Sequence, residues 1–298
     1  DKKMKDKIKQ YVKTSIIATM AVLGVTSCNN QNNTSFDTSK RITVVTRDDG
    51  SGTKSAFMEI IGLKGKKDPA GVISASSTTT VLATVKTNPL AIAYESLGYV
   101  TDEVKILKVD QVDCNVENIK TGDYKIARPL NIVYKETILQ NPVFEDFYKF
   151  LGSSDSQKII SDNGYVSIKD ETSSYVKEND FKGTINISGS TSLQPLMTLL
   201  AEKYETIQTN VDVIVSGGGS GTGYKNAENN VSDFGMISET FNSEKAPSCT
   251  SYEVAKDGIA LIVNKVNSFD NITLEHLKNI YDCDINGEEK ISTWGDLA

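Results

Sequence analysis

The sequence is poor in the residues that many enzymes use for acid–base catalysis. It contains one histidine, His276, in 298 residues. A Ser-His-Asp hydrolase needs a histidine beside a nucleophile on a glycine elbow. His276 lies instead in an amphipathic helical pattern, TLEHLKNIY, that has no such elbow. The sequence therefore argues against a hydrolase of this type.

Cysteine is also scarce, and its spacing fits no metal site. Apart from Cys28, the chain has Cys114, Cys249 and Cys283, without the CxxC pairs of a zinc site. An odd number of thiols cannot pair completely, although one disulfide outside the cytoplasm stays open as an alternative. We expect no metal, no cofactor and no chemistry from these three thiols.

Positive charge is in the minority. The chain carries 32 lysines and arginines against 39 acidic residues, a formal net charge of -7. The basic residues are scattered and form no cluster that would attract nucleic acid. With 38% hydrophobic residues, the 298-residue chain is long enough for one large or two ordinary globular domains.

The apolar run near the N-terminus is short for a membrane span. Residues 14–27 follow a lysine-rich stretch, and a span needs about 20 apolar residues. This pattern is typical of an export signal, and VTSC resembles the lipobox of bacterial lipoproteins, in which the cysteine is lipidated after cleavage. We predict a signal peptide at 1–27, a lipid anchor on Cys28 and a flexible polar tether at 28–40. The protein is then expected outside the cytoplasm, anchored to the cell membrane.

The rest of the chain alternates strand and helix patterns. RITVVTR reads as a strand, and KSAFMEIIG follows a glycine loop with the apolar spacing of a helix. The same plan returns in GTINISGSTSLQPLMTLLAEKYE and in VDVIVSGGGSGTGYKNA. The alternation predicts an α/β protein with largely parallel strands. Further strands are expected at LAIAYES, RPLNIVYK and DGIALIVNK, and further helices at NPVFEDFYKFLGS, SDSQKIISDNG and TLEHLKNIY.

Each of these three units has a loop of glycine and hydroxyl residues between its strand and its helix. The core GSGT occurs both in RDDGSGTKSAF and in SGGGSGTGY. A helix N-terminus offers unpaired N–H groups and the positive end of the helix dipole, so such a loop can bind an anion. Helix capping is the simpler explanation for any single loop. Three loops in one chain favour a ligand.

The residue order excludes two known motifs, the Walker A loop of nucleotide-binding proteins and the GxSxG elbow of hydrolases. A Walker A loop, GxxxxGK[ST], needs a glycine before Lys54, where the chain has Thr53. The GxSxG elbow fails at Ser220 because Thr222 replaces its last glycine. The loops therefore point to recognition of a free anion.

Charged residues near these loops suggest which anion. Arg47 ends a predicted strand, where its guanidinium can make paired hydrogen bonds to an oxyanion, and Asp49 is placed to hold that guanidinium. Asp233, in SDFGMIS, can accept a hydrogen bond only from an anion that still carries a proton. Phosphate keeps a proton near neutral pH and sulfate does not, so an acidic residue selects phosphate. Capping of a helix or turn is the alternative role for Asp233.

Taken together, the motifs resemble the phosphate-binding proteins of bacterial ABC phosphate importers over nearly all of residues 41–298. The resemblance implies a two-lobed periplasmic-binding-protein fold of the second type, with phosphate between the lobes. Ser216 and Thr222 compete with Ser220 for one of the roles. The motifs are VTRDDGSGTKSAF, ISGSTSLQPLM, SGGGSGTGYKNAENNVSDFGMIS, DGIALIVNK, RPLNIVYK, and TLEHLKNIYDCDI with TWGDL. The phosphate-binding residues that the resemblance implies are Arg47, Ser51, Gly52, Thr53, Thr191, Ser192, Ser220 and Asp233, with Asp49 supporting Arg47.

The order of the motifs departs from the usual family order, in which the GSTS loop comes first and the arginine loop follows the tryptophan segment. Joining Ala298 to Arg41 would restore that order, so we interpret the chain as a circular permutant, with truncation as the alternative. The expected lobes are 41–125 with 266–298, and 126–265. The hinge crossings are expected near Ala127 and Lys265.

The function implied by the resemblance is capture of inorganic phosphate by a monomeric protein outside the cytoplasm and its delivery to an ABC permease. No bond is made or broken in such a role. A binding protein for sulfate or molybdate and a phosphate sensor without transport stay open as alternatives. A secreted phosphatase is the least favoured, because the sequence lacks its nucleophile and metal set.

Overall fold

The computed structural model describes residues 36–170 and 172–298. The predicted signal peptide, Cys28 and the first part of the tether lie outside the described residues. In the part of the chain that is described, no helix is long and apolar enough to cross a membrane.

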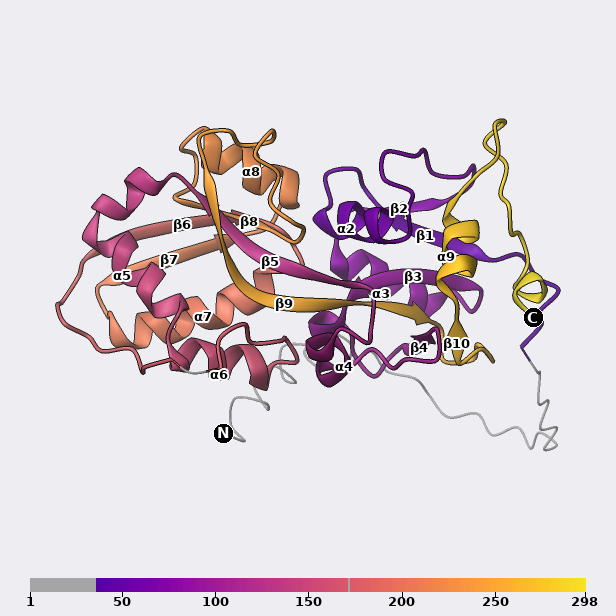
Figure 1. The fold of residues 1–298 in the computed structure, drawn as a ribbon, viewed down its shortest axis with the longest axis horizontal. Coiled ribbons are helices and arrows are strands. Elements are labelled where there is room, and N and C mark those ends of the chain that lie inside the picture. The colour runs from indigo at the N-terminus through magenta and orange to yellow at the C-terminus, as the bar shows by residue number, and fades with distance from the viewer. Residues whose placement is uncertain (1–35, 171) are drawn as a thin grey trace, which may run out of the picture. The chain divides into compact units, whose positions relative to one another are not determined.

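A mixed sheet runs through the described residues (Figure 1). The strands are β1 (Thr43–Arg47), β2 (Ile73–Ala75), β3 (Ala91–Ser96), β4 (Lys105–Val109), β5 (Ala127–Tyr134), β6 (Gly183–Gly189), β7 (Val211–Ser216), β8 (Phe234–Ile237), β9 (Thr250–Val263) and β10 (Asn271–Ile272). Their order in the sheet is β2-β1-β3-β9-β5-β8-β6-β7, with β4 paired to β9 and β10 paired to β4.

The predicted α/β class is confirmed, but the expectation of largely parallel strands is wrong. β1 runs parallel to β2 and β3, and β6 runs parallel to β7 and β8, as strand–helix units require. In contrast, β9 is antiparallel to β3, β4 and β5, and β5 is antiparallel to β8. The β5–β9 pairing joins segments more than 100 residues apart, such as Arg128 with Asp257. Local patterns do not reveal pairings of this kind.

Helices cover the sheet (Figure 1), and three of them begin at the glycine loops, at Gly52, Gln194 and Ser220. They are α2 (Gly52–Ile60), α3 (Thr78–Thr87), α4 (Val116–Thr121), α5 (Pro142–Leu151), α6 (Ser154–Asp162), α7 (Gln194–Ile207), α8 (Ser220–Glu228) and α9 (Leu274–Tyr281), with short 3₁₀ turns η1 (Leu97–Tyr99), η2 (Glu136–Gln140) and η3 (Trp294–Leu297).

The helix α3 was not predicted, because its sequence TTTVLATVKT is rich in β-branched residues, which disfavour helices. Its stability comes from tertiary packing and a cap. Val81 and Val85 are fully buried, and the Ser77 hydroxyl accepts the N–H of Thr80 at 3.2 Å. A buried face and a cap thus outweigh the weak intrinsic propensity.

Two large hydrophobic clusters lie along the sheet. The first draws its buried residues from 42–126 and 259–297, together with Val166, and the second from 130–255. The strands β5 and β9 pass from one cluster to the other. On β9 the change falls between Ala255 and Ile259, ahead of the expected crossing at Lys265. The expected residue boundaries of the lobes stay a proposal.

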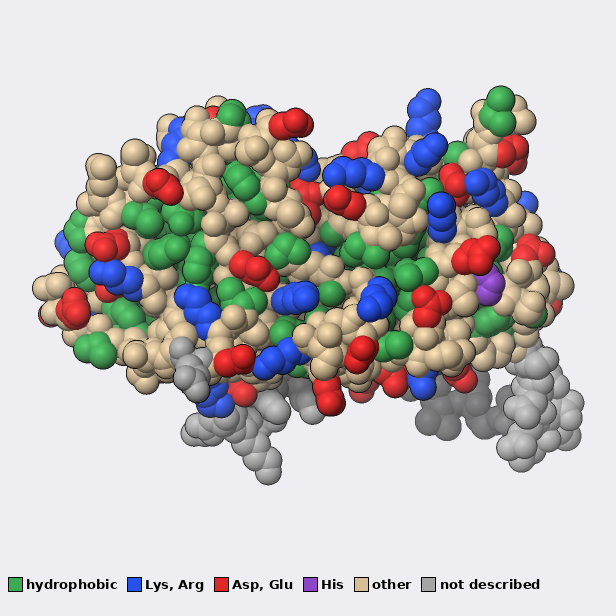
Figure 2. Space-filling model, in the orientation of Figure 1, with side chains coloured by type: hydrophobic (Ala, Val, Ile, Leu, Met, Phe, Trp, Pro, Cys, Tyr) green, Lys and Arg blue, Asp and Glu red, His purple; other side chains and the backbone are tan. Residues whose placement is uncertain are grey.

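Charged side chains of both signs are interspersed over the face shown in Figure 2, without a continuous basic area. This distribution agrees with the net charge of -7.

Candidate functional site

The two copies of GSGT are in direct contact. The backbone N–H of Gly221 donates to the carbonyl oxygen of Gly50 at 3.1 Å. Gly52 has no room for a side chain, since its β-carbon would lie 2.8 Å from the Ser220 β-carbon. Gly219 has a φ of 87°, a left-handed conformation that glycine adopts without strain. The repeated motif therefore builds one site from two distant parts of the chain.

Hydroxyl groups from the glycine loops are buried together at this contact. Thr53 Oγ1 lies 2.9 Å from Ser192 Oγ, and Ser220 Oγ lies 3.3 Å from Ser238 Oγ. These four side chains are at most 1% exposed. We call Ser51, Thr53, Ser192, Ser220 and Ser238 the hydroxyl cluster.

Ser238 was not predicted as a site residue. It directly follows β8, whereas Ser51 and Ser220 lie a few residues beyond the C-terminal ends of β1 and β7. A hydroxyl at the C-terminal end of a strand was thus the available signal in SDFGMIS. The acidic residue at the other end of the same segment carried the prediction instead.

Several site hydroxyls accept one N–H bond, which leaves their own proton free for another acceptor. Ser51 Oγ accepts from the Lys54 N–H at 3.3 Å, and Ser220 Oγ accepts from the Ser238 N–H at 3.0 Å. A hydroxyl has one proton to donate, and neither of these bonds uses it. These two hydroxyls can therefore act as donors, which is what an anion requires, although Ser220 also lies 3.3 Å from the Ser238 hydroxyl.

Ser220 is the residue of its loop that joins the cluster, rather than Ser216 or Thr222. Thr222 Oγ1 donates to the Gly218 carbonyl at 2.7 Å. Ser216 Oγ lies 3.5 Å from the Ile187 carbonyl. Both competitors use their hydroxyl on the backbone of their own half of the sheet.

Arg47 lies beside the cluster and is 2% exposed. Its Nε donates to the Ala75 carbonyl at 3.1 Å, and its Nη2 donates to the Ser76 carbonyl at 3.4 Å and to Thr191 Oγ1 at 3.2 Å. Its Nη1 is buried and has no hydrogen-bond partner. An unsatisfied buried donor costs about 1–3 kcal/mol, and more when it is charged. The free Nη1 is therefore a specific indication of a polar ligand.

Burial also shifts the electrostatics of Arg47. Loss of solvent lowers the pKa of its guanidinium, while the nearby Glu95 raises it. Arginine nevertheless stays protonated in proteins. The site therefore holds a permanent positive charge.

The two acidic residues expected at the site lie elsewhere. The Asp49 side chain is 97% exposed and pairs with Lys54 Nζ at 2.8 Å, so it does not support Arg47. Asp233 precedes β8 and accepts the backbone N–H of Asn186, inside β6, at 2.7 Å, which is a bond to a neighbouring strand and caps neither a helix nor a turn. At about 3.3 Å per strand residue, Asp233 lies roughly 16 Å along the chain from Ser238. Asp233 therefore lies at the end of β8 opposite to Ser238 and the hydroxyl cluster.

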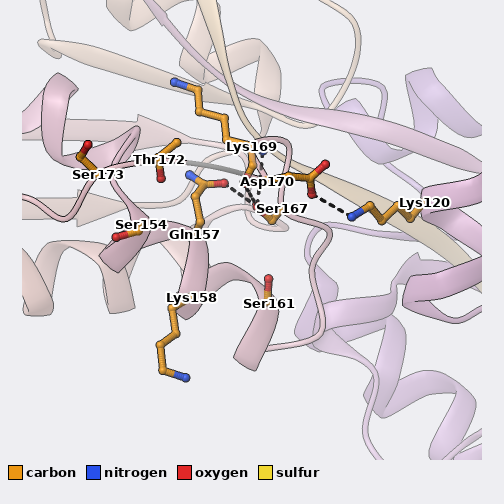
Figure 3. Close-up of a pocket in the computed structure, with 10 residues that line it drawn as sticks. All are labelled: Lys120, Ser154, Gln157, Lys158, Ser161, Ser167, Lys169, Asp170, Thr172 and Ser173. Atoms are coloured by element: carbon orange, nitrogen blue, oxygen red, sulfur yellow. Dashed lines mark hydrogen bonds and ion pairs between the residues drawn. The ribbon is translucent and has the colours of Figure 1, made fainter.

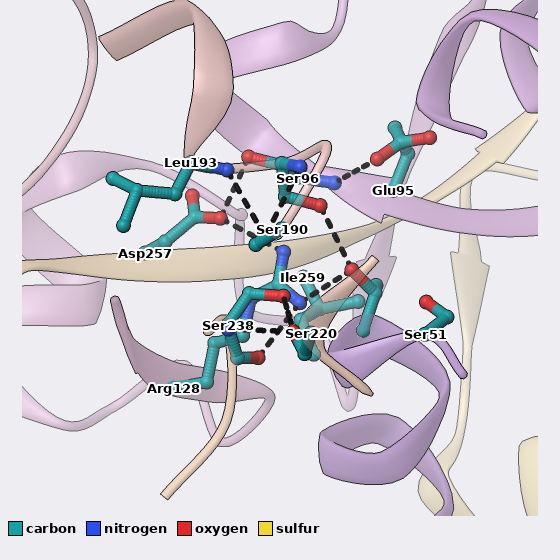
Figure 4. A network of polar contacts seen from close by, with 12 residues as sticks. Ser51, Glu95, Ser96, Arg128, Ser190, Leu193, Ser220, Ser238, Asp257 and Ile259 are labelled. Atoms are coloured by element: carbon teal, nitrogen blue, oxygen red, sulfur yellow. Dashed lines mark hydrogen bonds and ion pairs between the residues drawn. The ribbon is translucent and has the colours of Figure 1, made fainter. Parts of the chain in front are cut away.

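A network of buried charges adjoins the hydroxyl cluster (Figure 4). Arg128 Nη1 donates to Thr53 Oγ1 at 2.5 Å, and Arg128 Nη2 lies 3.2 Å from Asp257 Oδ2. Glu95, on β3, accepts the N–H of Ser96 with Oε1 at 2.8 Å, and its Oε2 has no partner. Burial raises the pKa of Glu95 to about 7, although Arg47 and Arg128 lower it. Burial likewise raises the pKa of Asp257.

Sequence reasoning missed Glu95, Arg128 and Asp257. Each lies in or beside a strongly apolar segment of a strand, in AIAYES, ARPLNIVY and DGIALIV, and Asp257 is in the middle of β9. A charged residue inside such a segment is rarely buried without a partner. That signal could have singled them out, although not their mutual contacts.

One cavity lies away from this site. It has a volume of about 670 Å³ and includes Lys120, Lys158 and Lys169 around α6 (Figure 3). A second cavity, of about 420 Å³, is lined by Thr191 together with Ser77 and Thr78. This second cavity reaches the contact between Thr191 and Arg47. Among residues 36–170 and 172–298, no group of three His, Cys, Asp or Glu side chains could hold a metal ion.

Known proteins resemble this chain over nearly its whole length. A family model described as a PBP superfamily domain matches residues 6–155 and 176–297. The phosphate-binding protein PstS 2 of Streptococcus agalactiae serotype V is 32% identical over 98% of this chain and 100% of its own length. A crystal structure of a phosphate-binding protein of a phosphate ABC transporter from Streptococcus pneumoniae TIGR4 has a TM-score of 0.69 and 32% identity, covering 87% of this chain and 100% of that chain.

These matches also bear on the order of the motifs. PstS 2 of Streptococcus pneumoniae serotype 4 is 32% identical over 91% of this chain and 93% of its own length. PstS of Bacillus subtilis is 33% identical over 44% of this chain and 43% of its own. The match to the streptococcal proteins thus runs through nearly the whole chain, whereas the match to the Bacillus protein covers less than half of it. A circular permutation relative to other relatives stays a prediction.

Proposed function

This chain belongs to the PBP superfamily and has the two-lobed periplasmic-binding-protein fold, and from this membership we propose that it captures inorganic phosphate for an ABC importer. The observation that carries the proposal is the free Nη1 of Arg47 beside the hydroxyl cluster. A buried cation with an unused donor, next to hydroxyls oriented as donors, fits a small oxyanion. Relatives that match nearly the whole chain are named phosphate-binding proteins.

The binding mechanism follows from the burial of these donors. The hydroxyls of Thr53, Ser192 and Ser220 are at most 1% exposed, so a bound phosphate exchanges its hydration shell for protein hydrogen bonds. Arg47 adds charge-assisted bonds, which are roughly twice as strong as neutral ones. The net charge of -7 gives no long-range attraction to anions. Affinity then depends on local, preoriented donors, and no bond is made or broken.

Selection of phosphate over sulfate needs a carboxylate near the anion, and Glu95 is better placed for this role than Asp233. Glu95 is fully buried and its Oε2 has no partner. The register of β1 and β3, Val44 opposite Ile92, extends to place Arg47 beside Glu95. A phosphate O–H can donate to the free Oε2, whereas sulfate offers only acceptors. We therefore assign the proton-accepting role to Glu95.

The cellular setting completes the proposal. Export and lipidation at Cys28 would anchor the protein to the outer face of the cell membrane, where a monomer delivers phosphate to the permease. The lobes, joined through β5 and β9, would close on the anion and open again at the permease. Dependence of phosphate uptake on this protein would distinguish an importer subunit from a sensor.

Calorimetric titration tests the proposed function directly. The full chain is freed of bound anion and titrated with phosphate, sulfate and molybdate between about pH 5 and pH 8. We expect tight phosphate binding and at least about 100-fold weaker sulfate binding, as for sites that leave a buried polar group unpaired. Equal affinity for the two anions would contradict the selection mechanism, and no phosphate binding would contradict the function. Release of phosphate from a phosphomonoester would instead support the phosphatase alternative.

A further inference from the structure

Arg128 reaches the hydroxyl cluster from β5 and contacts it at two points. Its side chain is buried, and Nη1 donates to Thr53 Oγ1 at 2.5 Å and to the Ser238 carbonyl at 3.1 Å. Figure 4 shows Arg128 beside Ser238 and Ser220. One guanidinium nitrogen therefore bridges the arginine loop and the end of β8.

The direction of the Thr53 bond is fixed by chemistry. A guanidinium can only donate, so Thr53 Oγ1 accepts from Arg128 and keeps its own proton for another partner. In this structure Ser192 Oγ lies 2.9 Å from Thr53 Oγ1, and either hydroxyl could be the donor of that bond. A bond from an ionised donor is stronger than a neutral one and polarises the hydroxyl that accepts it. Arg128 thus makes Thr53 an oriented and strengthened donor.

Asp257 holds the guanidinium in this position. Arg128 and Asp257 are direct partners in the register of β5 and β9, and their side chains are 1% and 0% exposed. Asp257 Oδ2 also accepts from Ser96 Oγ at 2.6 Å. An ion pair that serves only stability is the alternative, because breaking a buried pair destabilises a protein. Such a pair would not change anion affinity through Thr53.

We propose that Arg128 is a positioning residue for anion binding, which acts by fixing the Thr53 hydroxyl as a hydrogen-bond donor to the bound anion. The inference rests on the proposed function. It adds a second buried cation to a site for which the sequence indicated one arginine. It also connects the anion site to the two strands that join the hydrophobic clusters.

A double-mutant cycle tests the inference. The dissociation constant for inorganic phosphate is measured by calorimetry on the full chain with Arg128→Lys, Thr53→Val and both changes together. Lysine keeps the charge opposite Asp257 but lacks the rigid fork of donors. In the wild-type background, we expect Arg128→Lys to weaken phosphate binding about tenfold. In a chain that already carries Thr53→Val, the same change should weaken it less than about twofold. The same factor in both backgrounds would overturn the inference.

Two further variants keep the result decisive. Thr53→Ser retains the hydroxyl, so Arg128→Lys should again weaken binding about tenfold in that background. If Arg128→Lys does not fold, Asp257→Asn takes its place in the cycle, since it loosens the anchor of Arg128 while leaving the arginine. Failure of the wild-type chain to bind phosphate contradicts the proposed function as well. Equal factors in a chain that binds phosphate contradict only the role of Arg128.

Discussion

Gly52 packs directly against Ser220, so closely that a β-carbon on Gly52 would overlap the Ser220 hydroxyl. The same β-carbon would lie 2.8 Å from the Ser238 hydroxyl oxygen. Only glycine allows the backbone of the arginine loop to approach the other hydroxyls this closely. The contact explains why a glycine is needed at this place in the first GSGT copy.

Gly52→Ala should weaken phosphate binding by about tenfold or more, because overpacking by one methyl group typically costs about 1–3 kcal/mol. The added carbon pushes Ser220 and Ser238 away from the arginine loop. Gly50→Ala is the matched control, since nothing lies within 4 Å of a β-carbon there. Calorimetry on both variants measures the effect. Similar losses for the two would show that the fit at Gly52 is not what the site needs.

Arg47→Met should weaken phosphate binding by more than about 100-fold, because each hydrogen bond from a charged group contributes about 1.5–3 kcal/mol. Methionine keeps most of the apolar stem, so the fold is preserved. Arg41→Met is the control, as Arg41 is exposed and pairs with Glu289 at 2.7 Å. Retention of near-native affinity by the Arg47 variant would mean that another loop binds the anion.

Much of the site could be predicted because its signals are local. Arg47, Ser51, Thr53, Ser192 and Ser220 all lie where a strand pattern ends and a helix pattern begins, and the structure brings them together. A helix N-terminus is set by a few neighbouring residues, so its position and chemistry can be read from the chain.

The remaining parts of the site depend on pairings that the chain does not show locally. Arg128 meets Asp257 only because β5 and β9 pair across the sheet. Asp233 and Ser238 lie in one short segment, and only the direction of β8 decides which of them faces the anion loops. Since β8 runs parallel to β6, its C-terminal end, with Ser238, is the one beside Ser190. The direction of β8, rather than residue type, therefore places Ser238 and not Asp233 beside the glycine loops.

Glu95→Gln should reduce the selection of phosphate over sulfate, and Asp233→Asn should leave it unchanged. If the Glu95 carboxylate accepts the phosphate proton, Glu95→Gln supplies an N–H donor instead, and the ratio of phosphate to sulfate affinity should fall at least about tenfold. Asp233→Asn should leave that ratio unchanged, because its carboxylate accepts the backbone N–H of Asn186. Titration of both variants with both anions provides the comparison. A lost ratio in the Asp233 variant alone would return the role to Asp233.

The burial of Glu95 predicts a stability that depends on pH in the absence of ligand. Its pKa is raised from 4.5 to about 7, so the folded chain keeps a proton that the unfolded chain has released. The free energy of unfolding from this group is fully present below about pH 4.5 and declines until about pH 7, because the unfolded state then binds fewer protons. Asp257, whose pKa is also raised by burial, adds a decline of the same sign that Glu95→Gln leaves in place.

Urea unfolding followed by circular dichroism at several pH values isolates the Glu95 contribution. Relative to Glu95→Gln, the wild-type chain should lose stability between about pH 4.5 and pH 7 and then stay level. Glu202→Gln changes an exposed residue on α7. Its free energy of unfolding should depend on pH as that of the wild type does. If the free energy of unfolding of the Glu95 variant changes with pH as that of the wild type does, then the Glu95 carboxyl has the same pKa in the folded and unfolded chains. That result would also weaken the proposal that the Glu95 carboxylate accepts a proton from the bound phosphate.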